Sequence, residues 1–446
     1  MSHRGTPHKN PMNGLNYLSS LAKWRGSGIF SLDNVRAVCH DLGNPQDLIT
    51  SIHVAGTNGK GSVSAAVSSI LGCAGKKVLM TSSPHLVSVN ERILIDGYPI
   101  SDIELSENVL QVKDSVTRLG LELSHFEAIT IAAFLSAAKN KVDYMVVEVG
   151  LGGRLDATNI IKSPAVSAIV SIGLDHENVL GNTAALIARE KAGIIKDNGN
   201  VVVGDLSSES LDVIIEISKS HNATIYRAQN EFKAEALPNN VIEYWDKSGA
   251  KFQFTSSLKG EFQANNMGVA VKICSILGID YISCIEGIQN VRWPARMMSL
   301  YQGSDRIIID SAHNIPGIQA LTYYLSNNNL SGIPIVFGAL NTKRWQDMIE
   351  LLAPHVTEWY PVKIESSEAV PVDDIVTCLS GLGINSNDIY TGLGLIDTID
   401  FALNNSESGN ILICGSMYLA GSVLRDLKVS LPPVWRRQNK KNLERN

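Results

Sequence analysis

Residues 51–62 read Ser-Ile-His-Val-Ala-Gly-Thr-Asn-Gly-Lys-Gly-Ser, an apolar run that breaks into a glycine-rich turn. Residues 62–72 then continue with helix-compatible spacing and no proline. A strand, a glycine turn and a helix bring free backbone N–H groups and the positive end of a helix to one point, which favours a bound anion. The glycines allow the backbone to approach a phosphate closely. Lys60 adds a positive charge, and the hydroxyl of Thr57 or Ser62 suits Mg²⁺.

The spacing of the glycines leaves two kinds of nucleotide site open. The common phosphate-loop pattern has Gly-Lys-Ser/Thr in succession, whereas Gly61 stands between Lys60 and Ser62. A G-x-x-G-x-G spacing also fits a dinucleotide turn, which needs an acidic residue about 20 residues on, at the end of the second strand. The second strand, residues 77–81, runs into Ser-Ser-Pro-His with no carboxylate. We favour a nucleotide triphosphate, and a turn-to-helix junction without a ligand is the third interpretation.

Length and composition are typical of a globular enzyme with two or three domains. The chain has 446 residues, of which 44% are hydrophobic. Its net charge of −6 argues against nucleic acid as a partner, and no apolar run reaches the roughly 18 to 20 residues of a membrane span. The six cysteines show no C-x-x-C spacing, which is typical of reduced thiols. We therefore expect a cytoplasmic α/β enzyme that acts on small molecules.

Polar motifs follow several of the expected strands directly. Apolar runs at residues 142–149 and 165–172 lie between helical stretches, which predicts a parallel sheet covered on both faces. Ligands of such sheets lie beyond the carboxyl ends of the strands. The motifs found there are residues 56–62, 82–85, 148–159 and 175–176. We expect them to converge on one site.

A second β/α alternation begins after a proline-containing linker at residues 291–296. Strands are predicted at residues 306–310, 333–337, 358–362, 388–390 and 411–414, with helices between them. Before the linker, residues 226–255 are expected to form short antiparallel strands. The predicted fold is therefore α/β: a P-loop-type, mostly parallel ATPase domain in residues 1–296, followed by a smaller Rossmann-like α/β domain in residues 297–446.

Three segments of the first domain have both a functional and a structural interpretation. Glu148 ends a buried strand, where an unpaired carboxylate is costly, so it either binds Mg²⁺ or forms a salt bridge, for instance with Arg154. The glycine-rich loop that follows suits close approach to a ligand, and Arg154 with Asp156 either binds a polar ligand or forms a structural ion pair. His176 follows the next strand, where we favour a metal site shared with Glu148 over a structural histidine.

Further candidates lie in the predicted helix at residues 183–194, in the second domain and in the linker, and each has two interpretations. From its neighbours alone, Lys191 reads as a solvated surface lysine. Asp310 at a strand end and His313 before a helix suit ribose or phosphate contacts, although Asn314 as a helix N-cap with His313 exposed is the alternative. Arg296 in the linker either reaches a nucleotide between the domains or lies on the surface.

Taken in order, these segments resemble the folylpolyglutamate synthases and dihydrofolate synthases, relatives of the Mur ligases. The matching segments are residues 53–62 (HVAGTNGKGS), 82–86 (SSPHL), 90–93 (NERI), 126–127 (FE), 148–159 (EVGLGGRLDATN), 174–176 (LDH), 189–194 (REKAGI), 293–296 (WPAR) and 310–314 (DSAHN). The resemblance covers about residues 15 to 425, and the family's loop carries the glycine found here at Gly61.

The resemblance implies an ATP-dependent ligase that joins L-glutamate to a pteroate or folate carboxylate through an acyl phosphate. It implies both dihydrofolate synthase activity, on dihydropteroate, and folylpolyglutamate synthase activity, on tetrahydrofolate. Folylpolyglutamate synthase activity alone is one alternative. A nicotinamide-dependent oxidoreductase that uses the G-x-x-G-x-G loop, and a catalytically silent nucleotide-binding module, are the others. We expect a monomer with no nucleic-acid or membrane partner.

The resemblance also implies roles for individual residues. The ATP-binding residues would be Thr57, Asn58, Gly59, Lys60, Gly61, Ser62, Asn266, Arg296 and Asp310, with Asn265 as the alternative to Asn266. The ligands of two Mg²⁺ ions would be Ser83, Glu148, His176 and Lys191, the last as a carbamylated lysine. The pterin side would be bound by Phe126, Gly153, Arg154, Leu155 and Asp156. Lys60, Lys191 and His313 would act in catalysis.

Overall fold

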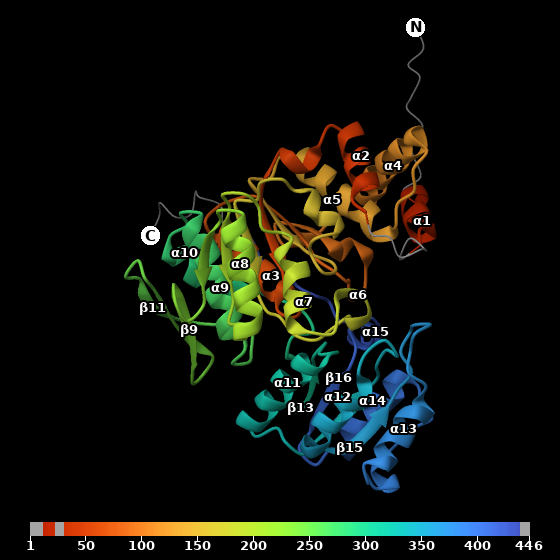
Figure 1. Ribbon diagram of the computed structural model, residues 1–446. Helices are drawn as coiled ribbons and strands as arrows, with labels where there is room; N and C mark the ends of the chain where they lie inside the picture. Colours follow the sequence, from red (N-terminus) through yellow and green to blue (C-terminus); the bar gives the residue numbers. More distant parts are fainter. Residues whose placement is uncertain (1–11, 23–30, 438–446) are drawn as a thin grey trace.

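Three sheets and their covering helices make up the computed structural model, which describes residues 12–22 and 31–437. The upper part of Figure 1 holds an eight-stranded sheet, in the order β4-β3-β2-β5-β1-β6-β7-β8, and a three-stranded sheet, β11-β10-β9. The lower part holds a five-stranded sheet, β12-β13-β16-β14-β15. The prediction of a mostly parallel α/β domain followed by a smaller one is confirmed.

The eight-stranded sheet is parallel except at one edge. Its parallel strands are β1 (Thr50–Ala55), β2 (Val78–Thr81), β5 (Tyr144–Glu148), β6 (Val166–Ile169), β7 (Asn200–Val203) and β8 (Thr224–Arg227). The edge is an antiparallel hairpin, β3 (Ile93–Ile95) and β4 (Tyr98–Pro99). Because helices cover both faces, the central strands β1, β5 and β6 are buried almost throughout and are mostly apolar.

Alternate residues of the central strands enter two separate cores. Val146 of β5 packs in one core with α3 (Lys60–Cys73), α9 (Gln263–Ile276) and α10 (Tyr281–Asn290). Met145 and Val147 pack in the other with α4 (Asp102–Leu119) and α5 (His125–Asn140). Helices α1 (Met12–Ser20) and α2 (Asp33–Asp41) complete that second layer. Helices α7 (Ala184–Ala192) and α8 (Ser208–Ser220) pack in a further cluster with Ile169, Val201 and Val203 of β6 and β7, and α6 (Glu177–Leu180) contacts α7. Helix α3, which begins at the glycine-rich turn, is buried along its length.

The small antiparallel sheet extends the first core. It consists of β9 (Phe232–Leu237), β10 (Val241–Asp246) and β11 (Lys251–Thr255), which confirms the short antiparallel strands expected there. Phe232, Tyr244 and Phe254 are buried in the same core as α9 and α10. Helix α10 was not predicted from the sequence.

The second domain is an α/β unit built on the five-stranded sheet. Its strands are β12 (Met298–Gln302), β13 (Asp305–Ile309), β14 (Ile333–Phe337), β15 (Val356–Pro361) and β16 (Asn410–Cys414). Its helices are α11 (Ile315–Asn327), α12 (Trp345–Leu352), α13 (Val372–Gly381), α14 (Leu395–Asn405) and α15 (Met417–Asp426). The antiparallel edge strand β12 was missed, because the sequence places it next to the proline-containing linker.

The strand predicted at residues 388–390 is wrong. Residues Ser386–Asp388 form a single 3-10 turn, in which the side chain of Asn385 accepts the N–H of Asn387 at 2.9 Å. Such local side-chain hydrogen bonds compete with strand pairing. Ile389 forms an isolated bridge to Trp359, whose carbonyl accepts the N–H of Tyr390 at 2.9 Å, and no strand forms at residues 388–390.

The end of the described chain returns from the second domain to the first. Val434 donates its N–H to the carbonyl of Gly97 at 3.0 Å and accepts the N–H of Arg292 at 2.8 Å. Trp435 is 1% exposed and packs in the first core, next to Gly72. The division at residue 296 therefore stays a proposal, to which we add that residues 434–435 belong with the first domain.

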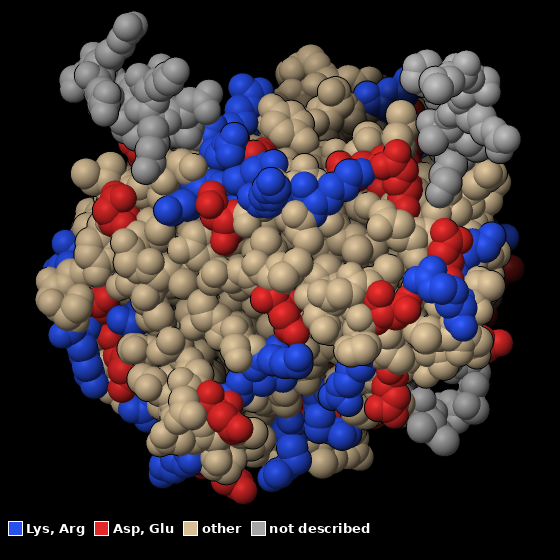
Figure 2. All heavy atoms as spheres, turned by 90° about the horizontal axis from the view of Figure 1, so that it is seen from above, with Lys and Arg blue, Asp and Glu red and all other residues tan. Residues whose placement is uncertain are grey.

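Charged side chains of both signs are interspersed on the surface. Figure 2 shows this from above, where Lys and Arg lie next to Asp and Glu across a face that is otherwise uncharged. Within residues 12–22 and 31–437, no helix is both long and apolar enough to cross a membrane.

Candidate active site

The carboxyl ends of β1, β2 and β5 open on a cavity of about 660 Å³ that also contacts the second domain. The predicted site residues that line it are Thr57, Asn58, Gly59, Lys60, Gly61, Ser83, Phe126, Glu148, Arg154, Leu155, Asp156, His176, Lys191, Arg296 and His313. The predicted convergence of the strand-end motifs is confirmed. The cavity lining does not include Ser62, Gly153, Asn266 and Asp310.

The glycine-rich turn is packed tightly against two residues far along the chain. A Cβ at Gly59, where φ is 80°, would lie 2.5 Å from Oδ1 of Asn266. A Cβ at Gly61 would lie 2.7 Å from Nε1 of Trp293. Asn265 instead accepts the N–H of Asp205 at 2.9 Å through its side chain. Of the two asparagines, Asn266 is therefore the one that backs the turn, and its contact with a nucleotide stays a prediction.

Two lysines meet at the carbonyl of Gly56. Nζ of Lys60 donates to this oxygen at 3.0 Å and to the carbonyl of Thr57 at 3.1 Å, while Nζ of Lys191 donates to Gly56 at 3.0 Å. Lys191 is only 4% exposed, so the residue-based expectation of a surface lysine is wrong. Burial, and then the charge of Lys60, lowers the pKa of Lys191 to about 7. An amine in this position is neutral for much of the time near pH 7.

The carboxylate of Glu148 has few partners for a buried charge. It is 5% exposed and accepts the N–H of Ser83 at 3.3 Å. Burial raises its pKa to about 7 against the opposing charge of Lys60. The proposed salt bridge to Arg154 is absent, because Arg154 pairs with Glu190 at 2.9 Å.

Beside this carboxylate lies a hydroxyl without a partner. Oγ of Ser83 is buried and has no hydrogen-bond partner among the residues that the structure describes. Buried polar atoms are nearly always hydrogen-bonded, so an orphaned one needs an explanation. A hydroxyl oxygen next to an under-bonded carboxylate is an environment that suits a hard cation.

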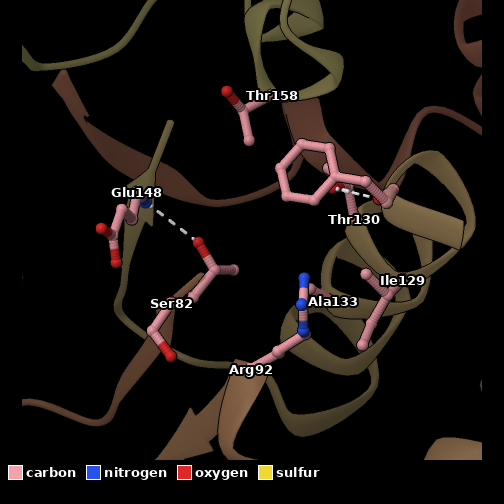
Figure 3. A pocket seen from close by; sticks show the side chains of 9 residues that line it. Ser82, Arg92, Ile129, Thr130, Ala133, Glu148 and Thr158 are labelled. Carbon is pink, nitrogen blue, oxygen red and sulfur yellow. Dashed lines mark hydrogen bonds between the residues drawn. The ribbon is translucent and has the colours of Figure 1, made fainter. Parts of the chain in front are cut away.

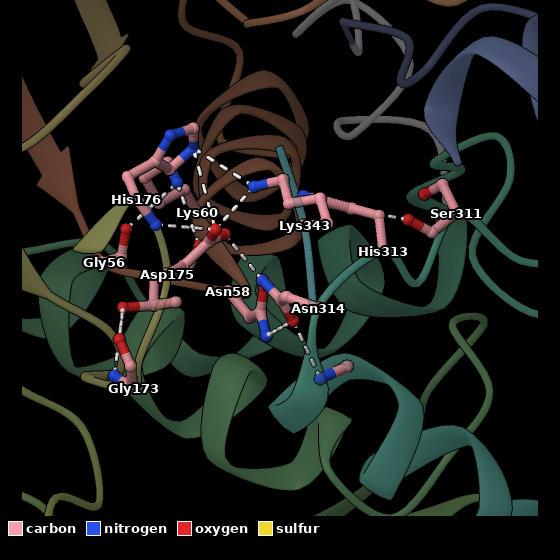
Figure 4. Close-up of polar contacts among 12 residues, drawn as sticks. Gly56, Asn58, Lys60, Gly173, Asp175, His176, Ser311, His313, Asn314 and Lys343 are labelled. Atoms are coloured by element: carbon pink, nitrogen blue, oxygen red, sulfur yellow. Dashed lines mark hydrogen bonds and ion pairs between the residues drawn. The ribbon is translucent and has the colours of Figure 1, made fainter. Parts of the chain in front are cut away.

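The two domains are joined across the cavity by polar side chains (Figure 4). Asn58 and Asn314 exchange two amide hydrogen bonds, at 2.9 and 3.0 Å, and Asn314 also donates to Asp175 at 2.9 Å. Lys343 approaches Oδ1 of Asp175 at 2.5 Å and Nε2 of His176 at 3.3 Å. Residues from both domains thus form one network at the mouth of the phosphate loop.

Lys343 dominates the electrostatics of this network. Burial by itself would raise the pKa of Asp175, but the ammonium of Lys343 outweighs it and the pKa is held well below its usual value. Burial, followed by the charge of Lys343, lowers the pKa of His176 to about 4. Lys343 was missed from the sequence, where the only available signal was its place in a polar turn after the buried strand β14.

Two further predicted residues line the cavity, Arg296 of the linker and His313 of the second domain. Nδ1 of His313 faces the carbonyl of Ser311 at 2.8 Å, so Nδ1 carries the proton and Nε2 the lone pair. His313 is not exposed as the alternative had it, and burial lowers its pKa to about 4. Asn314 does cap helix α11, by accepting the N–H of Gly317 at 2.9 Å, in addition to its bonds to the first domain.

Asp310 is engaged by its own backbone neighbours. Its two carboxylate oxygens accept the N–H groups of Met297 and Ala312, at 2.9 and 2.8 Å. The carboxylate is 6% exposed and holds the linker to the second sheet. Its predicted contact with a ribose stays a prediction.

The aromatic wall of the cavity is formed where Phe126 meets the loop after β5. A Cβ at Gly150 would lie 2.4 Å from the ring of Phe126, so the loop can pass the ring only as glycine. Gly153 is needed for a different reason, since a Cβ there would lie 2.8 Å from the carbonyl of Glu190 in α7. Leu155 adds apolar surface beside Arg154.

The carboxylate of Asp156 organises this loop. It accepts the N–H of Leu151 at 2.8 Å and both the N–H and the hydroxyl of Thr158, at 3.0 and 2.5 Å. The hydroxyl of Thr158 also contacts Nε2 of the fully buried His53 at 2.8 Å. The structure thus shows a loop-forming role for Asp156, and its contact with a pterin stays a prediction.

Arg92 is a cavity residue for which the sequence suggested no role. Figure 3 shows it across from Glu148, at a narrow extension of about 10 Å³ lined also by Thr130 and Thr158. Its Nε donates to Nδ1 of His85 at 2.9 Å. In the described part of the chain, no carboxylate lies within ion-pair distance of its guanidinium. The Asn-Glu-Arg-Ile motif was the signal that could have found it.

Metal ligands of the usual types are too few here to form a site by themselves. Within the described residues, no three His, Cys, Asp or Glu side chains are grouped so that they could hold a metal ion. Any cation at Glu148 therefore needs oxygens of other kinds, such as the Ser83 hydroxyl or phosphate oxygens.

Comparison with known proteins supports the resemblance. Residues 54–274 match the Mur ligase middle domain family. The dihydrofolate synthase/folylpolyglutamate synthase of Bacillus subtilis (strain 168) is 34% identical over 414 residues, which cover 89% of this chain and 95% of that protein.

Two solved structures are similar to the whole chain. The Mycobacterium tuberculosis folylpolyglutamate synthase complexed with ADP has a TM-score of 0.85 and 29% identity, covering 95% of this chain and all of that one. E. coli FolC in complex with DHPP and ADP has a TM-score of 0.84 and 27% identity, covering 95% and 99%. This chain therefore belongs to the dihydrofolate synthase/folylpolyglutamate synthase family.

Proposed function

We propose that the protein is an ATP-dependent ligase that joins L-glutamate to the carboxylate of a pteroate or folate. It acts both as a dihydrofolate synthase and as a folylpolyglutamate synthase. One observation carries the proposal: the cations of the phosphate loop, the under-bonded Glu148 and the aromatic wall at Phe126 face the same cavity. The relatives support it, since the Bacillus subtilis protein carries both names and the E. coli structure holds DHPP with ADP.

The reaction explains why the cavity combines these parts. A carboxylate is a poor electrophile because oxide does not leave. Its oxygen therefore attacks the γ-phosphorus of ATP, which forms an acyl phosphate and releases ADP. The amino group of glutamate then attacks the acyl carbon, loses a proton and releases inorganic phosphate, which leaves the amide. Phosphoryl transfer of this kind is catalysed mainly by positioning and by neutralising charge.

The phosphates of ATP would bind at the start of α3. The N–H groups at residues 59–62 and the positive end of the helix attract phosphate, and Lys60 exchanges its carbonyl contacts for phosphate oxygens. Arg296 of the linker and Lys343 of the second domain supply positive charge. Because Lys343 and Asn314 already contact the first domain, the nucleotide would bind in a cavity that both domains shape.

The acceptor would lie against the aromatic wall, with its carboxylate toward the phosphate loop. Phe126 and Leu155 offer apolar surface for a pterin ring, and Arg92 and Arg154 offer donors at the edge of the cavity. His313 has its Nε2 lone pair available to accept a hydrogen bond from the ammonium of the incoming glutamate. Each of these roles is proposed from the position of the side chain.

The residues present fit Mg²⁺, which typically takes one or two carboxylates together with substrate phosphates. Glu148 supplies a carboxylate, and the orphaned hydroxyl of Ser83 and a ring nitrogen of His176 supply further donors. When bound, Mg²⁺ neutralises charge on the transferred phosphoryl group. We propose two such ions, in keeping with the family resemblance.

Carbamylation of Lys191 would complete this arrangement. Its neutral amine adds to CO₂ and loses one proton, so that an ammonium becomes a carboxylate-like group. The pKa of about 7 makes the neutral amine available near pH 7. The reaction would also replace the repulsion between Lys191 and Lys60 at Gly56 by attraction.

The dinucleotide alternative is not favoured. Strand β2 ends at Thr81, and residues 82–85 offer no carboxylate for a ribose. Folylpolyglutamate synthase activity alone is distinguished from the bifunctional proposal by the choice of acceptor.

The proposal is tested by identifying the product. The purified protein is incubated with ATP, Mg²⁺ and L-glutamate, with dihydropteroate or tetrahydrofolate as acceptor, and the folates are analysed by mass spectrometry. We expect the mass of one added glutamyl residue on each acceptor, with one ADP per amide. Product from tetrahydrofolate alone would leave the narrower enzyme, and no product from either acceptor would contradict the proposal. Reactions without L-glutamate are the control.

A further inference from the structure

His85 and Arg92 both belong to the connector between β2 and β3, residues 82–92, in which Arg92 is the last residue. The connector is held by bonds that do not involve either side chain. Ser82 donates its N–H to the carbonyl of Arg92 at 3.2 Å and its hydroxyl to the carbonyl of Glu91 at 2.8 Å. The carboxylate of Glu91 accepts three successive N–H groups, those of Leu86, Val87 and Ser88. The fold of the connector is therefore fixed without the His85 side chain.

One further bond joins the two side chains across the connector. Nε of Arg92 donates to Nδ1 of His85 at 2.9 Å. Because arginine has donors only, Nδ1 must carry the lone pair and Nε2 the proton. Among the described residues, the two Nη groups of Arg92 have no hydrogen-bond partner in the protein. The histidine thus holds one edge of the guanidinium and leaves the other edge for a ligand.

The surroundings of Arg92 indicate what that ligand is. The Arg92 side chain lies across from Glu148, the proposed magnesium ligand (Figure 3), and Phe126, the proposed pterin wall, lines the same pocket. Met417 and Tyr418 of the second domain line the same cavity. A planar guanidinium with two unbonded Nη groups matches a carboxylate, which it can bind through two parallel hydrogen bonds. Both organic substrates of the proposed reaction carry carboxylates.

We propose that His85 is a positioning residue: it fixes the plane of the Arg92 guanidinium so that the Nη groups face the cavity and receive a substrate carboxylate. The carboxylate is that of the acceptor or that of the incoming L-glutamate. The identity of the substrate rests on the proposed function, whereas the positioning of Arg92 rests on the hydrogen bond itself.

Two amide substitutions of His85 distinguish the positioning of the Arg92 guanidinium from a role of His85 in packing alone. His85→Asn keeps an oxygen near the place of Nδ1 and can still accept from Nε of Arg92. His85→Gln carries its amide farther out, near the place of Nε2, and removes that acceptor. His85→Ala removes both. Unfolding midpoints of the three variants control for the integrity of the connector.

The kinetic arm measures KM for the acceptor and for L-glutamate separately, together with kcat. For His85→Gln and His85→Ala we expect KM for one of the two substrates to rise about tenfold, which is about 1.4 kcal/mol, with kcat little changed. The substrate whose KM rises identifies the carboxylate. For His85→Asn we expect KM close to that of the wild type. An unchanged KM in all three variants, or equal impairment of His85→Asn and His85→Gln, would overturn the proposal.

The structural arm does not depend on activity. Crystal structures of the wild type, His85→Asn and His85→Gln show the plane of the guanidinium directly. We expect it to be kept in His85→Asn and turned in His85→Gln, and an unturned guanidinium in His85→Gln would refute the positioning role. If the wild type were inactive on both acceptors, the proposed function would be wrong. The crystal structures would still show whether His85 positions Arg92.

Discussion

Two of the places where the first domain buries charge are partnered very differently. Beneath the small sheet, one carboxylate oxygen of Asp246 accepts the N–H and the hydroxyl of Ser248, and the other accepts from Tyr244 at 3.3 Å and from Lys272 at 3.4 Å. Lys272 also lies over the ring of Tyr226. Burial would raise the pKa of Asp246, but the Ser248 bonds and the Lys272 charge outweigh it and hold the pKa below its usual value.

At the cavity the protein leaves the charges only partly compensated. Glu148 accepts one weak backbone bond, and burial raises its pKa to about 7. Burial lowers the pKa of Lys191 to about 7 as well. A charge that is buried without full pairing costs stability. The difference indicates that the charges of Asp246 and Lys272 stabilise the fold, whereas Glu148 and Lys191 bind a ligand that completes their pairing.

Replacing one lysine in each region gives the largest expected difference. Lys60→Met should lower kcat on the order of 10³-fold, because it removes a preorganised cation at the phosphates. Lys272→Met should leave kcat near the wild-type value but lower the free energy of unfolding by about 3 kcal/mol, since Asp246 then stays buried without its cation. ADP formation and urea unfolding measure the two effects. Equal loss of activity in both variants would contradict the division into functional charges at the cavity and structural charges at Asp246.

Isosteric substitutions of Glu148 and Asp246 test the same difference between the cavity and the structural ion pair. Glu148→Gln should lower kcat about 10²-fold while the free energy of unfolding stays level or rises, because a costly buried charge is removed. Asp246→Asn should lower the free energy of unfolding by about 3 kcal/mol, because Lys272 loses its partner. A Glu148→Gln variant that is both active and destabilised would place Glu148 with the structural charges.

The pH dependence of stability tests whether the hydrogen bonds that join His53, Thr158 and Asp156 stabilise the fold. Burial lowers the pKa of His53 to about 3, whereas the unfolded chain binds this proton near the ordinary value of 6.5. The contribution of neutral His53 to the free energy of unfolding is therefore fully present above pH 6.5. It is lost as the pH falls toward 3, at about 1.4 kcal/mol per pH unit. At pH 5 the loss is about 2 kcal/mol, and His53→Gln should not show it. Urea unfolding of both proteins at pH 5 and pH 8 checks this; parallel losses would contradict the account.

The smallest expected effect is at the half-exposed pair of Arg154 and Glu190. Arg154→Ala should change the free energy of unfolding by less than about 1 kcal/mol, because exposed ion pairs stabilise little. Arg189→Ala, at the exposed pair with Glu216, is the matched control. Only Arg154→Ala should raise KM for the acceptor, since only Arg154 lines the cavity. A rise in both variants would mean that the effect comes from helix α7 and not from the substrate.

Features encoded in a few neighbouring residues were predictable from the sequence. The turn at residues 56–62 and the apolar strands β1, β5 and β6 follow from short-range patterns, and parallel strands bring their carboxyl ends to one edge. The approach of Phe126 to the loop after β5 came from the family resemblance and not from the pattern. The false strand at residues 388–390 shows the limit, since a local turn there prevailed over strand propensity.

Features set by distant contacts were not predictable. Lys343 approaches Asp175 only because the second domain closes on the first, and the two residues are far apart in the chain. Trp435 reaches the first core by crossing back over the domain linker. The burial of Lys191 depends on the packing of α7 against the phosphate loop, so its neighbours in sequence pointed to the surface. None of these contacts leaves a periodic signal.

The central claim is that this cavity activates a carboxylate by phosphoryl transfer, and an isotope experiment tests it most directly. The acceptor carries ¹⁸O in its reacting carboxylate and is turned over with ATP, Mg²⁺ and L-glutamate. We expect one ¹⁸O atom in the inorganic phosphate for each amide formed, because the acyl phosphate passes that oxygen to phosphate when glutamate attacks. Unlabelled phosphate accompanying labelled amide product would contradict it.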